Sequence, residues 1–186
     1  VEKLTKKAVT LKLGITQGCD LGPVINARQQ RNILKEVARA KEVGGKVLCG
    51  GMSPDSDELK NGCYVEPTLI ADLPENADLY SCEIFGPVAT IQRVRDMSHA
   101  LEVANSTGYG LTAAIHTESV DLGGRCIIKK KNGVVNINIG TFGSEPHMPF
   151  GGFGASGNGT REPGVEALDV YSELKNISVL VRNYLI

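Results

Sequence analysis

The most informative segment of this chain is Ser81-Cys82-Glu83-Ile84-Phe85-Gly86-Pro87-Val88. On an extended backbone, side chains alternate between two faces, so Glu83 and Phe85 are expected to point the same way. Gly86-Pro87 then predicts a sharp change of direction, because glycine tolerates unusual φ values and proline fixes φ. A carboxylate beside an aromatic ring can hold a polar, partly aromatic ligand. The alternative is a strand with one exposed glutamate and one core phenylalanine.

Length and composition indicate an ordinary globular chain. Its 186 residues are 41% hydrophobic and 22% charged, with a formal net charge of −1, so one domain with a real core is expected. This balance gives no electrostatic reason to bind nucleic acid, and no apolar run reaches the roughly 20 residues that cross a membrane. The five cysteines lack metal-site spacing, which predicts no metal, reduced thiols and a cytoplasmic location.

Strand-like and helix-like segments alternate along the chain, which predicts an α/β fold with a largely parallel sheet and flanking helices. Helical periodicity begins at Val1 without a capping residue, so we expect that the chain begins inside a domain. Pro67 indicates an edge strand or a bulge, because proline cannot donate to a sheet. The expected strands are 46–49, 64–70, 89–94, 111–117 and 134–137, and the expected helices lie over 1–13, between 26 and 44, and after 98 and 119.

Helix starts can be placed from capping residues. Asn26 is predicted to cap the second helix, with Gln29 at the third helical position of a capping box. Apolar residues at Ile33, Val37 and Ala40 predict the buried stripe of that helix. Ser98 and Ser119 are predicted to cap the next two helices.

The C-terminal third is rich in glycine. Residues 152–157 match the G-x-G-x-x-G pattern, but Pro146 and Pro149 precede them and no helix start follows, so we expect a close-packed loop instead of a dinucleotide-binding turn. A last helix is expected over 165–172. An apolar strand over 174–185 would then leave the domain as an extended arm and pair with another subunit.

Several motifs occur in an order that resembles the aldehyde dehydrogenase superfamily. Besides residues 81–88, these are Tyr109-Gly110-Leu111, the strand end at Asn136, and the run from Pro149 to Gly159. The likeness covers nearly the whole chain and corresponds to the C-terminal part of the catalytic domain. It implies a partial catalytic domain over 1–163, followed by a C-terminal helix and oligomerisation strand over 164–186. The segment around His147 resembles the semialdehyde-oxidising branch.

The resemblance implies roles for four residues. Glu83 would bind the ribose hydroxyls next to the nicotinamide of NAD or NADP, and Phe85 would pack near the nicotinamide ring. Phe142 and Phe150 would line the tunnel for a small aldehyde substrate. Core packing is an equally open interpretation for Phe142.

The family's catalytic groups are not among these positions. Its nucleophilic cysteine lies in a G-Q-x-C stretch and its base in an L-E-x-G-G stretch, and neither occurs here. We therefore expect no catalytic residue in this chain and no activity of the chain alone. Two hypotheses follow: the chain is part of an NAD(P)-dependent aldehyde dehydrogenase that forms a homo-oligomer, or it is a truncated assembly module without chemistry.

Overall fold

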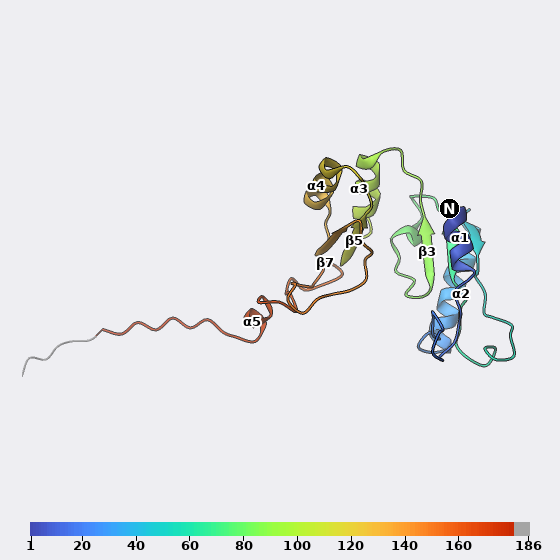
Figure 1. Cartoon of the computed structure of the whole chain (residues 1–186), viewed down its shortest axis with the longest axis horizontal. Helices are drawn as coiled ribbons and strands as arrows, with labels where there is room; N and C mark the ends of the chain where they lie inside the picture. The colour runs from blue at the N-terminus through green and yellow to red at the C-terminus, as the bar shows by residue number, and fades with distance from the viewer. Residues whose placement is uncertain (181–186) are drawn as a thin grey trace, which may run out of the picture. The chain divides into compact units, whose positions relative to one another are not determined.

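The computed structural model of the protein describes residues 1–180 (Figure 1). Contacts between residues divide the chain into two compact units, Val1–Thr107 and Gly108–Ile186. This division into units reflects which residues pack against one another. The predicted boundary between residues 163 and 164 separates a catalytic part from an assembly arm, and it stays a prediction.

The first unit is built around a three-stranded sheet in the order β1-β2-β3. β2 pairs with β1 in antiparallel and with β3 in parallel orientation. Helices α1 and α2 precede the sheet in sequence, and a short 3₁₀ helix, η1, lies between β2 and β3. The bounds are α1 Glu2–Ala8, α2 Ala27–Glu42, β1 Lys46–Cys49, β2 Thr68–Ala71, η1 Asp78–Ser81, β3 Val88–Ile91 and α3 Met97–Asn105.

The sheet is covered on both faces at its central strand, β2, all four of whose residues are buried. Ile70 belongs to the hydrophobic core with Ile33 and Val37 of α2. Leu69 lines a hollow together with Leu4 of α1. Because neighbouring residues of a strand point to opposite faces, α1 and α2 lie on opposite sides of this sheet.

Local signals placed α2 correctly. Asn26 accepts a hydrogen bond from the backbone N–H of Gln29 at 2.9 Å, as an N-cap should. The predicted stripe is buried: Ile33 and Ala40 are 0% exposed and Val37 is 1% exposed. This stripe is the centre of the first unit's core.

Other boundaries differ from the prediction. β2 begins at Thr68, directly after Pro67, because proline has no N–H for the ladder. β2 is the central strand and not an edge, and the irregularity falls instead in β1, between Val47 and Cys49. α1 was expected to reach residue 13 but ends at Ala8. The next two residues, Val9 and Thr10, are β-branched and therefore have a low helix propensity.

The start of α3 was predicted wrongly. Asp96, not Ser98, is the N-cap, and its side chain accepts from the backbone N–H of His99 at 2.9 Å. Both residue types cap helices well, so the pattern alone did not separate them. The prediction for Ser119 is confirmed, since its hydroxyl accepts from the N–H of Leu122 at 3.3 Å.

The second unit contains two separate two-stranded sheets. β5 and β6 pair in parallel, and β4 and β7 pair in antiparallel orientation. The α/β class is therefore correct, but in the described residues two of the four strand pairs are antiparallel and the sheets are mixed. The bounds are β4 Tyr109–Gly110, β5 Thr112–Ile115, α4 Val120–Lys129, β6 Val134–Ile137, β7 Phe153–Gly154 and α5 Ala167–Val170.

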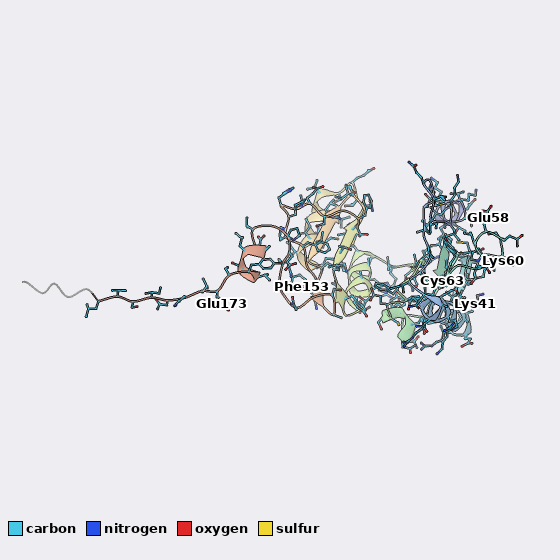
Figure 2. All side chains as sticks on the ribbon, turned by 90° about the horizontal axis from the view of Figure 1, so that it is seen from below. Lys41, Glu58, Lys60, Cys63, Phe153 and Glu173 are labelled. Atoms are coloured by element: carbon cyan, nitrogen blue, oxygen red, sulfur yellow. The ribbon has the colours of Figure 1, made fainter. Side chains whose placement is uncertain are left out.

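The G-x-G-x-x-G segment was expected to be a close-packed loop, and this holds only in part, because two of its residues form strand β7 and four of the six are exposed. Its Phe153, labelled in Figure 2, lies in β7. The guanidinium of Arg161 stacks 4.7 Å from the centre of that ring. No helix begins within residues 152–157, so no helix N-terminus is offered to a pyrophosphate.

The C-terminal helix is shorter than expected. α5 covers only four residues of the predicted range 165–172. After it the chain continues without helix or strand through residue 180 (Figure 1). Residues 181–185 of the predicted strand lie outside the described residues, so the oligomerisation arm stays a prediction. Between residues 1 and 180, no helix is long and apolar enough to cross a membrane.

Gly86 gives a direct test of the packing between α2 and the loop before β3. A Cβ at Gly86 would overlap the Cδ1 of the fully buried Ile33. We expect Gly86→Ala to lower the free energy of unfolding by about 1–3 kcal/mol, the usual cost of overpacking a core. Urea denaturation measures this loss. Gly22→Ala is the matched control, because a Cβ there meets nothing within 4 Å; an equal loss in both variants would contradict the packing argument.

The cap of α3 gives a prediction about pH. The hydrogen bond from the backbone N–H of His99 lowers the pKa of Asp96 below its usual value. A lowered pKa in the folded state means that the stabilisation is present above the unfolded-state pKa and is lost as the pH falls through the folded-state pKa. Asp96→Asn keeps the capping oxygen but cannot ionise, so we expect a smaller loss of stability in acid than in the wild type.

Urea midpoints at a series of acidic pH values measure this difference. Asp55→Asn, in an exposed loop, serves as the control variant. If Asp96→Asn and the wild type lose the same unfolding free energy as the pH falls, ionisation of the Asp96 cap does not contribute to the acid dependence of stability.

Candidate functional site

Glu83 and Phe85 lie in the loop between η1 and β3, both exposed to solvent. The expectation of a regular extended backbone was wrong, because Phe85 has a φ of 54°, in the left-handed region. The two side chains still line a common hollow of about 300 Å³, which we call the Glu83 hollow. The Phe85 ring is 76% exposed, which excludes the core alternative for this residue.

The loop is anchored on its C-terminal side by the turn that Gly86-Pro87 predicted. The backbone N–H of Val88 donates to the carbonyl of Gly86 at 2.7 Å, which closes a three-residue turn. The carbonyl of Pro87 accepts from the N–H of Thr68 at 2.9 Å and joins the turn to β2. Ile84 and Val88 pack against the core, so the residues on either side of Phe85 are held while its ring stays outside.

The N-terminal side of the loop is anchored by η1. Leu79 is buried, with 4% of its surface exposed. Asp78 forms an ion pair with Arg39 of α2, and the Arg39 guanidinium lowers the pKa of Asp78. Because this ion pair is solvent-exposed, it adds little to the stability of the unit. Its structural effect is to link η1 to α2.

Tyr80 of η1 also lines the Glu83 hollow. Its hydroxyl is buried and has no hydrogen-bond partner within the described part of the chain. Burial, with a smaller contribution from Glu75, raises the pKa of Tyr80 above its usual value. The buried hydroxyl is a hydrogen-bond donor that no group in the described part of the chain satisfies.

Gln29 is a site residue whose role the sequence did not reveal. Its side chain was expected to reach back to Asn26 in a capping box. Instead, its Nε2 donates to the carbonyls of Ile84 and Phe85, both at 3.0 Å. Gln29 and Phe85 also line a second hollow of about 400 Å³, the Gln29 hollow. No periodicity or spacing signals a contact across more than 50 residues.

Phe142 and Phe150 belong to the second unit, whereas Glu83 and Phe85 belong to the first. Phe142 is 86% exposed, and its ring lies against Gly140. Phe150 is half-buried, and its carbonyl accepts from the N–H of Glu162 at 2.7 Å. Because Phe142 is exposed, core packing within this unit does not explain why a phenylalanine occupies this position.

The loop that carries Phe142 follows β6 through Asn138, which has a φ of 60°. The Asn138 side chain accepts from the N–H of Thr117 at 2.8 Å and donates to its carbonyl at 2.9 Å. This double contact stabilises a backbone conformation that asparagine tolerates better than most residues. The ends of β5 and β6 are thereby tied together before the loop begins.

None of the five cysteines, all of which lie in the described part of the chain, forms a disulfide, and Cys126 is fully buried. Cys82 is exposed and lines the Glu83 hollow. Among residues 1–180, no three His, Cys, Asp or Glu side chains gather in a way that could hold a metal ion.

Known proteins of similar sequence match nearly the whole of this chain. The sequence model of the "Aldehyde dehydrogenase family" matches residues 1–177. The chloroplastic betaine aldehyde dehydrogenase of Beta vulgaris is 34% identical over 98% of this chain and 36% of that protein. The benzaldehyde dehydrogenase [NAD(+)] of Pseudomonas putida is 35% identical over 96% of this chain and 36% of that protein. The alpha-ketoglutarate semialdehyde dehydrogenase of Haloferax volcanii is 33% identical over 95% of this chain and 37% of that protein.

The structure also resembles solved enzymes. The crystal structure of betaine aldehyde dehydrogenase from Staphylococcus aureus in complex with NAD+ matches with a TM-score of 0.89 and 31% identity, over 100% of this chain and 38% of that one. The chain thus spans little more than a third of the length of these relatives. A family match over nearly its whole length, together with this fold, shows that the chain belongs to the aldehyde dehydrogenase family.

Proposed function

We propose that this chain forms the wall of an NAD(P)-dependent aldehyde dehydrogenase site that faces the nicotinamide end of the cofactor. The observation that carries the proposal is the pair Glu83 and Phe85, both exposed along one hollow on a loop anchored at both ends. In the whole enzyme, an aldehyde would be oxidised to a carboxylic acid.

The residues present suit that cofactor. The Glu83 carboxylate can accept hydrogen bonds from two neighbouring ribose hydroxyls. The flat, exposed ring of Phe85 offers a face on which an aromatic heterocycle can pack. When bound, the cofactor supplies the acceptor for a hydride, and the part of this chain's residues is to hold and orient it.

We assign no catalytic residue to this chain. Aldehyde oxidation through a covalent intermediate needs an activated thiolate and a base for water. Cys126 is fully buried, and the sequence contexts of the family's nucleophile and base are absent. The chain alone is therefore expected to bind the cofactor weakly and to turn over no aldehyde.

The substrate side of the proposal rests on Phe142 and Phe150, which would form aromatic walls for a small aldehyde. The exposed Phe142 ring is available for such contact. The semialdehyde branch is our choice within the family, and the similarity to the Haloferax volcanii enzyme supports it. We also propose a cytoplasmic location, although the names of three relatives specify chloroplasts or peroxisomes.

An assembly role is the second candidate function. The described part of the C-terminal segment exposes apolar side chains, with Leu174, Ile177 and Val179 each more than 70% exposed. Apolar residues on a single extended segment gain stability when they pair with another chain. We therefore propose that this segment contributes to a homo-oligomer in either hypothesis.

Titration of the 186-residue chain with NAD⁺, followed by saturation-transfer difference NMR, tests the cofactor proposal. We expect stronger saturation at the nicotinamide-ribose protons than at the adenine protons. Glu83→Gln should weaken binding roughly tenfold, or about 1.4 kcal/mol, because a charged acceptor is lost. Glu58→Gln, at an exposed position in a different loop (Figure 2), should leave binding unchanged.

Equal saturation at both ends of NAD⁺, or no transfer at all, would contradict the proposed orientation. A parallel assay with an aldehyde and NAD⁺ follows the absorbance of the reduced cofactor. Turnover by the isolated chain would show that a nucleophile has been overlooked.

A further inference from the structure

Gln29 contacts the peptide groups on both sides of Phe85. The carbonyl of Ile84 belongs to the peptide group that precedes Phe85, and the carbonyl of Phe85 belongs to the one that follows it. The Gln29 amide donates to both, each at 3.0 Å. Since rotation about φ and ψ turns these two peptide groups, a shared donor restrains both angles of Phe85 at once.

Phe85 needs such a restraint. It is one of three non-glycine residues with a positive φ in the described part of the chain, and this conformation is unfavourable for a residue with a Cβ. A residue is held there only when its surroundings determine it. Burial of the ring cannot do this, because the ring is 76% exposed.

The other anchors of the loop act on its neighbours. Ile84 packs against the core, and Gly86 lies against Ile33. These contacts fix where the loop passes over α2. Neither contact is made by the carbonyl of Ile84 or of Phe85, and Gln29 is the side chain that bonds to both of them.

We infer that Gln29 is a positioning residue, which holds Phe85 in its left-handed conformation and so directs the exposed ring toward the cofactor. This inference rests on the proposed function of Phe85. It assigns no contact between Gln29 and the cofactor. The clamp, meaning the two hydrogen bonds from Gln29, fixes the backbone that carries the ring before the ligand arrives and so lowers the cost of binding.

The adjacent residue provides a matched control. Gln30 lies on the same helix, and its amide donates to the carbonyl of Tyr64 at 2.8 Å and to the Ser53 hydroxyl at 3.1 Å. Gln29→Glu and Gln30→Glu therefore introduce the same charge and remove the same donors one residue apart. Only the first places a carboxylate, which accepts but cannot donate, against the carbonyls around Phe85.

Two measurements on the full chain separate the possibilities. Backbone coupling constants and chemical shifts of isotope-labelled protein report the φ of Phe85, and NAD⁺ titration reports the apparent Kd. In Gln29→Glu we expect Phe85 to leave the left-handed region. If its competent fraction falls to roughly a tenth, the apparent Kd rises about tenfold. In Gln30→Glu, both readouts should match the wild type.

A positive φ at Phe85 retained in Gln29→Glu, or an equal change in Gln30→Glu, would overturn the inference. Should Gln29→Glu fail to fold, Gln29→Asn is the second variant. It keeps a neutral amide but is one methylene too short for the clamp, so it is expected to release Phe85 in the same way. If wild-type protein does not bind NAD⁺, the proposed function fails, while the φ of Phe85 still decides whether the clamp exists.

Discussion

The contact between α2 and the loop before β3 is the constraint on which the candidate site depends. Ile33, fully buried on α2, lies directly against Gly86, where no side chain fits between helix and loop. This close approach brings the helix near enough for Gln29 to reach two loop carbonyls. It also keeps Ile84 packed against the core, while Glu83 and Phe85 remain exposed.

The same arrangement explains how one short loop can be both rigid and exposed. The loop gains its stability from the groups beside Glu83 and Phe85: the buried Leu79 before them and the turn at Gly86-Pro87 after them. A loop backbone that is held in this way loses little entropy when its exposed side chains meet a ligand. Preorganisation of this kind suits a binding wall, and it agrees with membership of the aldehyde dehydrogenase family.

Much of the fold followed from local pattern. The stripe of α2, the caps at Asn26 and Ser119, and the strands 46–49 and 134–137 were predicted because periodicity and capping depend on near neighbours in the chain. The sheet was predicted less well. Whether a strand pairs in parallel or antiparallel orientation depends on partners far away, and β1 and β7 form antiparallel pairs that the alternation of elements did not indicate.

The sequence alone determined the family, the segment with Glu83 and Phe85, and the glycine and proline that turn the chain after them, since these rest on residue types in order. Only the tertiary structure decided that Phe85 adopts a left-handed conformation and that Gln29 holds it there. The physical reason is that a side-chain amide bonds equally well to any carbonyl within reach. The packing of Ile33 against Gly86, not the local sequence, chose which carbonyls those are.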